Sequence, residues 1–264
     1  MRGSTPYSRG MNLLRRVAAV VRRPALGLEY AQWRLNPVRT IHGARVGGFV
    51  NFSEFHSAAR HIWDNELRFW RGYPFADGDM LDVGANLGIV SLVLAQRFPE
   101  RRIFSFEPHP TVFPALCENL KRNAARNVTP MQLAISDREG TAFFNASEER
   151  ANAHLAASGT PVQCRRLDAL CSELGIRRIA VLKIDIEGYE LAALSSAPLD
   201  IISTIHFELV PAICAARGTD PFGVPRLLTG AGFSLYRVNE RGELEEAVRN
   251  VGSQVDNLVA IRKT

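Results

Sequence analysis

The segment Leu-Asp-Val-Gly-Ala-Asn-Leu-Gly at positions 81–88 constrains the fold of this 264-residue chain more than any other. The apolar run 80–83 predicts a buried strand, and a turn containing Gly84 and Gly88 follows it before a helix begins. The next apolar run ends in Glu107. A strand, a glycine turn and a helix, with an acidic residue at the end of the following strand, are typical of nucleotide-binding α/β sheets.

The turn carries Asn86 between its glycines, where a dinucleotide-binding turn has a further glycine that lets the backbone approach a pyrophosphate. A side chain at this place favours a nucleotide without phosphates. S-adenosylmethionine, an adenosine joined to methionine through a sulfonium, is such a ligand. We expect Asp82 and the turn from Gly84 to Gly88 to hold its amino-acid end. Glu107 is expected to accept hydrogen bonds from both ribose hydroxyls; the alternative is a carboxylate that caps the helix expected from Thr111.

Composition and charge limit the other possibilities. The 46% of apolar residues are ample for a core, and no run of 18 apolar residues predicts a membrane-spanning helix. The four cysteines include no C-x-x-C pair, so neither a zinc site nor a redox motif is expected. Residues 1–50 carry nine arginines and one glutamate, which leaves −3 for the rest of a chain with net charge +5.

The basic charge therefore belongs to a predicted N-terminal extension, 1–52, ahead of a predicted S-adenosylmethionine-binding domain, 53–264. Within the extension, residues 11–23 predict a short basic amphipathic helix that ends at Pro24. Three roles are open: packing on the catalytic body, anchoring on anionic lipid, or an organelle transit peptide. A second helix, capped by its first residue, is expected over Ser53–Arg71.

From residue 80 the pattern alternates short apolar strands with helices. Strands are expected at 80–83, 103–106, 130–135, 180–186 and 201–209, and helices at 87–98, 111–125, 168–174 and 225–231. An extended pair, 142–145 and 162–167, flanks a polar insert, and a hairpin of 233–238 and 257–262 closes the chain. This order predicts an α/β fold with a doubly wound, mostly parallel sheet and one antiparallel strand at its edge.

Ligands of such sheets bind beyond the carboxyl ends of the strands, so the residues there are candidates. Asp137 follows the third strand and is expected to accept a hydrogen bond from the adenine amine. The alternative is a turn aspartate before Gly140. In the fourth strand, alternation places Lys183, Asp185 and Glu187 on one face, where they are costly to bury without partners.

Methyl transfer from a sulfonium is an in-line displacement with an excellent leaving group. The protein then supplies alignment and, for a hydroxyl acceptor, a base. We expect Asp185 or Glu187 to be that base; the alternative is that Asp185 supports the cofactor and Glu187 caps the next helix. His206 and Glu208, at the end of the fifth strand, are expected to line the acceptor site. Their alternatives are a satisfied sheet histidine and a partner of Lys183.

Several motifs occur in order along the chain: LDVGANLG at 81–88, FEPHP at 106–110, AISD at 134–137, LKIDIEGYE at 182–190 and NLVA at 257–260. With them the chain resembles the FkbM-type family of S-adenosylmethionine-dependent methyltransferases. The resemblance implies the seven-stranded sheet of class I methyltransferases and methylation of a hydroxyl on a sugar, glycan or natural product. It implies cofactor contacts from Asp82, Gly84, Asn86, Gly88 and Glu107. Asp185 and Glu187 are then expected beside the methyl group.

Other functions stay open at this point. Methylation of nucleic acid or protein is disfavoured because Asp-Ile-Glu-Gly stands where amino-methylating enzymes carry an Asn-Pro-Pro-Tyr type of motif, and because the catalytic body is net negative. An NAD(P)-dependent oxidoreductase is disfavoured by Asn86, and a non-catalytic nucleotide-binding scaffold is the fourth option. No metal is expected, although Asp185, Glu187 and Glu208 could hold a hard cation if they converge. We expect a cytoplasmic location, with peripheral membrane contact through 11–23.

Overall fold

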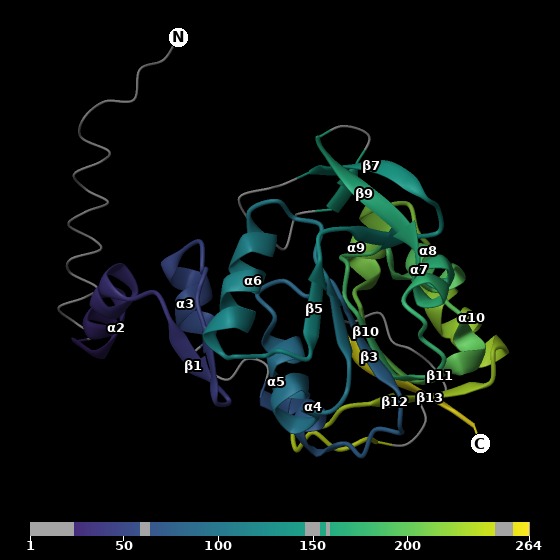
Figure 1. The fold of residues 1–264 in the computed structure, drawn as a ribbon, viewed down its shortest axis with the longest axis horizontal. Helices are drawn as coiled ribbons and strands as arrows, with labels where there is room; N and C mark the ends of the chain where they lie inside the picture. Colours follow the sequence, from purple (N-terminus) through teal and green to yellow (C-terminus); the bar gives the residue numbers. More distant parts are fainter. Residues whose placement is uncertain (1–23, 59–63, 146–153, 157–158, 246–255, 264) are drawn as a thin grey trace, which may run out of the picture. The chain divides into compact units, whose positions relative to one another are not determined.

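The computed structural model describes residues 24–58, 64–145, 154–156, 159–245 and 256–263 (Figure 1). Backbone contacts divide the chain into two units, residues 1–39 with 49–62 and residues 40–48 with 63–264. No helix among the described residues has the length and hydropathy to cross a bilayer. The predicted helix 11–23 lies outside the described residues, and the domain boundary between residues 52 and 53 stays a prediction.

The larger unit is built on a seven-stranded sheet in the order β12-β13-β11-β10-β3-β4-β5. The strands are β3 (Asp79–Val83), β4 (Ile103–Phe106), β5 (Val128–Met131), β10 (Ile179–Ile184), β11 (Ile202–Leu209), β12 (Phe233–Arg237) and β13 (Asp256–Arg262). All neighbours pair in parallel except β13, which pairs antiparallel with both β11 and β12. The predicted α/β sheet is confirmed, but the antiparallel strand lies one place inside the edge. The reason is that β13 returns from β12 and inserts beside β11.

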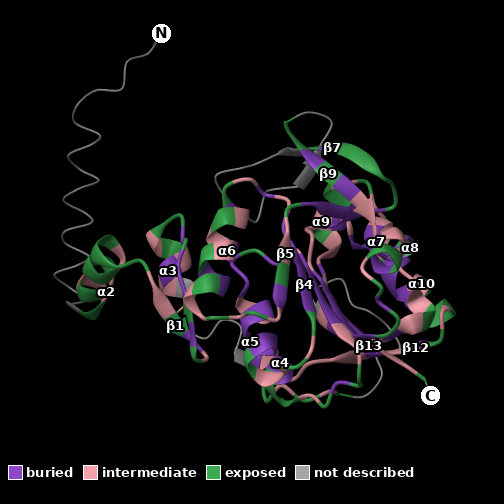
Figure 2. Ribbon diagram, viewed as in Figure 1, coloured by how far each residue is buried: buried purple, intermediate pink, exposed green. Residues whose placement is uncertain are grey.

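Helices cover both faces of this sheet (Figure 1). On one side lie α4 (Asp64–Gly72), α5 (Ile89–Arg97) and α6 (Val112–Arg122), and on the other α7 (Leu167–Glu173), α8 (Glu190–Ser195) and α10 (Gly223–Gly230). A short helix, α9 (Pro211–Ala216), which the sequence pattern did not predict, follows β11. Because both faces are covered, β10 is buried at all six positions, and every residue of it except Lys183 is apolar (Figure 2).

The strand order reverses between β3 and β10. The chain runs outward from β3 to β4 and β5, then crosses back to β10 and continues to β11 on the other side. Such a switch point leaves a place for ligands beyond the carboxyl ends of the two central strands. In this sheet Asp82 on β3 lies beside Lys183 on β10, which lies beside His206 on β11.

The predicted third strand, 130–135, is wrong as a single element. β5 ends at Met131, and β6 (Ala134–Ser136) belongs to a separate four-stranded sheet in the order β6-β9-β7-β8. The other strands of this smaller sheet are β7 (Gly140–Asn145), β8 (His154–Ala156) and β9 (Thr160–Arg166). Leu133 donates its backbone N–H to the Met131 carbonyl, so a tight turn separates two apolar strands that periodicity alone joins. The predicted extended pair is confirmed as β7 and β9.

The N-terminal elements differ from the prediction. A pair of short strands, β1 (Arg39–Ile41) and β2 (Ala44–Val46), follows α2 (Pro24–Leu35), and neither the strand pair nor α2 was predicted. Where one helix was expected over Ser53–Arg71, the described residues form α3 (Phe52–Ala58) and α4. The cap of α3 is Asn51 rather than Ser53, because the Asn51 Oδ1 accepts the Glu54 backbone N–H at 2.9 Å.

Candidate active site

The turn after β3 depends on backbone conformations that few residues adopt. Gly84, Asn86 and Gly88 have φ angles of +76°, +50° and +81°. A Cβ on Gly84 would lie 1.9 Å from the Asp185 carbonyl oxygen, so only glycine lets this turn meet the end of β10. A Cβ on Gly88 would lie 2.5 Å from Leu116 Cδ1 on α6. The absence of a side chain at Gly88 therefore lets α6 pack against the turn, and the predicted contact of Gly88 with the cofactor stays a prediction.

Glu107 holds this turn from the end of β4. Its Oε2 accepts the Asn86 backbone N–H at 2.8 Å, and its Oε1 accepts the His109 backbone N–H at 2.9 Å. Burial raises the pKa of Glu107, although the two amide hydrogen bonds and the charge of Lys183 lower it in part. Each carboxylate oxygen keeps one lone pair beyond these bonds. The group is therefore fixed in position while it can still accept hydrogen bonds from a ligand.

Asp82 lies beneath the turn rather than beside a ligand. It has no exposed surface, which corrects the expectation that it contacts the cofactor directly. Its Oδ2 accepts a hydrogen bond from Ser91 Oγ at 2.5 Å, and that hydroxyl lies 2.7 Å from Ser105 Oγ. Its Oδ1 lies 3.5 Å from Lys183 Nζ. Asp82 thus joins β3 to α5, β4 and β10 below the surface.

The LKIDIEG segment leaves the strand earlier than predicted. β10 ends at Ile184, so the alternation expected to place Glu187 on one face with Lys183 does not extend that far. Asp185 keeps 40% of its side chain exposed, and Glu187 has a φ of +57°. The following Glu190 holds this loop, because its Oε1 accepts the backbone N–H groups of residues 186 and 188 at 2.9 and 3.2 Å. Glu190, rather than Glu187, is therefore the carboxylate that accepts backbone N–H groups at the start of α8.

Two carboxyl groups near the carboxyl ends of β10 and β11, those of Glu187 and Glu208, have pKa values near neutrality. Burial and the charge of Asp185 raise the pKa of Glu187 to about 7, and the same two causes raise the pKa of Glu208 to about 7. Glu208 stands near the carboxyl end of β11. A carboxylate with a pKa close to the working pH is suited to take up a proton during a reaction.

These pKa values predict a pH-dependent stability effect. Because folding raises the pKa of Glu208 above the ordinary value of 4.5, the folded state loses stability as pH rises from about 4.5 to about 7. Glu208→Gln removes this loss, so it should increase the free energy of unfolding more at pH 8 than at pH 5.5. Urea unfolding at the two pH values measures the difference. An equal effect at both would show that Glu208 has no raised pKa.

His206 is placed differently from the expectation. It is 2% exposed, and its ring packs on Phe69 and Trp70 of α4 with ring centroids 5.7 and 4.8 Å away. Burial and the charge of Lys183 lower the pKa of His206 to about 3, so the ring is neutral. Neither ring nitrogen has a hydrogen-bond partner among the described residues, and Nε2 lies 3.7 Å from Glu66 Oε1. His206 therefore lies behind the site and not in it.

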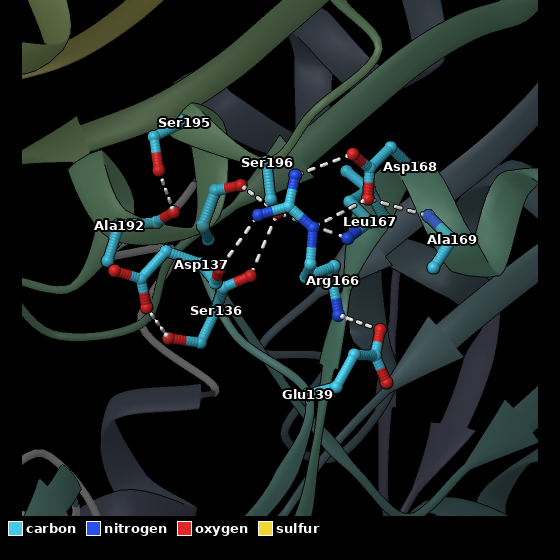
Figure 3. Close-up of polar contacts among 11 residues, drawn as sticks. Ser136, Asp137, Glu139, Arg166, Leu167, Asp168, Ala169, Ala192, Ser195 and Ser196 are labelled. Carbon is cyan, nitrogen blue, oxygen red and sulfur yellow. Dashed lines mark hydrogen bonds and ion pairs between the residues drawn. The ribbon is translucent and has the colours of Figure 1, made fainter.

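Asp137 directly follows β6 and is exposed, as its expected contact with adenine requires. Ser136 Oγ donates to Asp137 Oδ1 at 3.0 Å, and Arg166 Nη1 donates to the Asp137 carbonyl at 2.8 Å (Figure 3). Arg166 also pairs with Asp168, with Nη2 2.6 Å from Oδ2. The carboxylate and the backbone of Asp137 are thus both held, by residues that the sequence analysis did not single out.

The structure brings four of the predicted residues together and leaves two below the surface. Gly84, Asn86 and Glu107 form one connected group at the switch point, and Asp185 meets Gly84 through the close approach described above. Asp82 and His206 lie beneath it. Within the described part of the chain, no three His, Cys, Asp or Glu side chains are placed to hold a metal ion.

Comparison with known proteins gives a consistent picture. The profile of the methyltransferase FkbM domain matches residues 82–235. Hexuronic acid methyltransferase AglP of Haloferax volcanii is 29% identical, over 60% of this chain and 64% of AglP. The 31-O-demethyl-FK506 methyltransferase FkbM of Streptomyces tacrolimicus is 27% identical, over 75% of this chain and 88% of that protein.

A third relative is much longer. The AMB antimetabolite synthetase AmbE of Pseudomonas aeruginosa is 29% identical to 63% of this chain, but the match covers 10% of AmbE. The chain thus spans less than two thirds of the length of both AglP and AmbE.

Proposed function

Because this chain belongs to the FkbM family of S-adenosylmethionine-dependent methyltransferases, we propose that it methylates a hydroxyl group on a sugar, glycan or natural-product acceptor. The names of AglP and of the Streptomyces FkbM protein, which act on a hexuronic acid and on a demethylated FK506, support this acceptor class. The observation that carries the proposal is the Glu107 carboxylate. Two backbone N–H groups hold it beside the glycine turn at the switch point of the sheet.

Cofactor binding is assigned to the turn and to two carboxylates. Glu107 is proposed to accept the ribose hydroxyls, Asp137 the adenine amine, and the backbone of Gly84 and Asn86 to meet the amino-acid end. We assign Asp82 to the support of this turn, since solvent does not reach it. S-adenosylmethionine supplies the electrophilic methyl group when bound. The chain supplies the alignment that an in-line displacement needs.

The acceptor side is assigned to the end of β10. Asp185 keeps 40% of its side chain exposed there, and Lys183 Nζ lies 3.4 Å from its Oδ2, which limits the orientations open to it. We propose Asp185 as the base for the acceptor hydroxyl, with Glu187 beside it. Glu208, near the carboxyl end of β11, is the third carboxylate assigned to the acceptor side. His206 is assigned to packing behind these groups rather than to proton transfer.

Asp185→Asn is expected to leave the affinity for S-adenosylhomocysteine unchanged and to lower the methyl-transfer rate by about a hundredfold or more. The amide keeps the size of the side chain but cannot take up the proton. Calorimetry measures the first quantity. Transfer of labelled methyl groups to a panel of sugars, uronic acids and hydroxylated natural products measures the second. Asp200→Asn, at an exposed position in a 3₁₀ turn, is the control; a rate within twofold of wild type would assign Asp185 to support.

Thermal unfolding in the presence of four nucleotides tests the proposed function as a whole. A ligand that binds the native state raises the unfolding temperature by mass action. S-adenosylmethionine and S-adenosylhomocysteine should stabilise the protein, and NAD and NADP should not. Stabilisation by NAD or NADP alone would indicate an oxidoreductase instead.

We also propose that the chain works at the cytoplasmic surface of a membrane, through residues 11–23. Residues 1–23 contain six arginines and no acidic residue. In α2, which follows them, Leu28 and Leu35 are exposed and stand about two helical turns apart on one face. A basic segment followed by two exposed leucines on one helical face fits an anionic lipid surface.

Removal of residues 1–23 should abolish sedimentation with vesicles rich in phosphatidylglycerol and leave S-adenosylhomocysteine binding intact. Vesicles of phosphatidylcholine are the control, because they lack the negative charge that the arginines would meet. Equal sedimentation of the full and shortened chains would favour an extension that packs on the protein.

A further inference from the structure

Lys183 is a buried cation in the middle of the sheet. It is 5% exposed, and in the parallel register it stands between Asp82 on β3 and His206 on β11. Burying an ammonium group is costly unless charges and hydrogen bonds offset the loss of water. The sequence pattern alone predicts no role for Lys183 in the reaction. In the structure its charge lies at the switch point of the sheet, next to the turn that follows β3.

The Lys183 ammonium contacts both sides of the candidate site. Nζ donates a hydrogen bond to the Gly84 carbonyl at 2.7 Å, and Gly84 belongs to the turn assigned to the cofactor. The same Nζ lies 3.5 Å from Asp82 Oδ1 and 3.4 Å from Asp185 Oδ2. An ammonium group has three N–H donors, so one Nζ can interact with the Gly84 carbonyl, the Asp82 carboxylate and the Asp185 carboxylate at the same time.

The surroundings keep this group charged. Burial alone would lower the pKa of Lys183, but the carboxylates of Asp185 and Asp82 outweigh burial and raise it above the ordinary value. The neighbouring His206 is neutral and adds no competing charge, since burial and Lys183 itself hold its pKa at about 3. Lys183 is therefore a fixed positive charge with acceptors on three sides.

We propose that Lys183 is the positioning residue that couples the two halves of the site: it fixes the cofactor turn through the Gly84 carbonyl and the base through the Asp185 carboxylate. This proposal rests on the proposed function. Since the Nζ contacts Gly84 and Asp185 at once, loss of the ammonium releases both. Loss of a neighbouring apolar side chain should not selectively loosen either the Gly84 turn or Asp185.

Amide hydrogen exchange compares Lys183→Met with Leu182→Ala and needs no ligand. Leu182 is the buried neighbour of Lys183 on the opposite face of β10, so its truncation matches the loss of stability without touching the Nζ contacts. Lys183→Met should accelerate exchange selectively in residues 84–88 and 185–188. Leu182→Ala should accelerate exchange across the sheet without singling out these segments. The same pattern in both variants would overturn the proposal.

Calorimetry with S-adenosylhomocysteine measures the affinity and its dependence on pH. The pH dependence would not change if Lys183 only stabilised the fold. Lys183→Met should weaken binding about tenfold or more at pH 8, because a hydrogen bond from a charged donor is lost. It should also move the acidic pH limit of binding upward by about one unit, since Lys183 lowers the pKa of Glu107. The charges that face Glu107 are Lys183 and Asp82, and both remain in the Leu182→Ala control.

The outcomes separate the two proposals. Lys183→Met with wild-type affinity and an unchanged pH limit would overturn the role of Lys183. Wild-type protein that fails to bind S-adenosylhomocysteine would count against the proposed function, and hydrogen exchange would still decide the role of Lys183. If Lys183→Met does not fold, the pair Lys183→Met with Asp82→Asn removes the unpaired buried charge. That pair is then compared with Asp82→Asn alone.

Discussion

Glu107→Ala is expected to weaken the binding of S-adenosylhomocysteine by about 2–4 kcal/mol, as calorimetry would measure it. The variant would remove the two charge-assisted hydrogen bonds that we propose Glu107 makes to the ribose. It also frees the backbone N–H groups of Asn86 and His109, which the two carboxylate oxygens now hold at 2.8 and 2.9 Å. The ligand contacts and the shape of the turn are therefore lost together.

Glu118→Ala is the matched control for this prediction. Glu118 lies on α6, pairs with Arg122 at 3.2 Å and keeps 57% of its side chain exposed. An exposed pair of this kind contributes little to stability, so its loss should leave both folding and ligand affinity unchanged. Unchanged affinity in Glu107→Ala as well would remove Glu107 from the cofactor site.

Gly84→Ala is expected to destabilise the protein by roughly 2–6 kcal/mol, since it combines a strained left-handed backbone with an overpacked contact. The new Cβ would stand 1.9 Å from the Asp185 carbonyl oxygen, a distance that no side-chain rotation relieves. The turn and the end of β10 must then separate. Denaturant unfolding, monitored by circular dichroism, measures the loss.

Gly72→Ala provides the control for the glycine prediction. Gly72 ends α4, and a Cβ there would meet nothing within 4 Å. Its φ is not in the left-handed region, so alanine should be tolerated or slightly stabilising. A Gly84→Ala protein as stable as Gly72→Ala would contradict the close approach of the turn to Asp185.

Much of the fold follows from local patterns. Short apolar runs bounded by turns predicted β3, β4, β10 and β11 to within one or two residues at most ends, because strands covered on both faces are mostly apolar. The same reasoning failed at residues 130–135. There a turn from Met131 to Leu133 interrupts the run 130–135. The proline of this run, Pro130, lies inside β5 and not at the turn, so the pattern does not mark where the chain changes sheet.

The site was predictable where it depends on the turn and less so where it depends on packing. Glu107 directly follows β4, as the sequence pattern predicts, and Asp185 directly follows β10, which ends two residues earlier than expected. The burial of Asp82 and His206 depends on α5 and α4, which cover that face, and periodicity along a strand does not say how a helix covers it. Glu66, which lies 3.7 Å from His206, comes from α4, far away in the sequence.

A crystal structure with S-adenosylhomocysteine tests the central claim most directly. The claim is that the edge above β3 and β4 is shaped for adenosine without phosphates. We expect the two ribose hydroxyls within hydrogen-bond distance of Glu107 and the adenine amine at Asp137, with Asp185 facing the sulfur. Crystals grown at saturating ligand that show this edge empty, or the nucleoside bound elsewhere on the chain, would contradict the assignment.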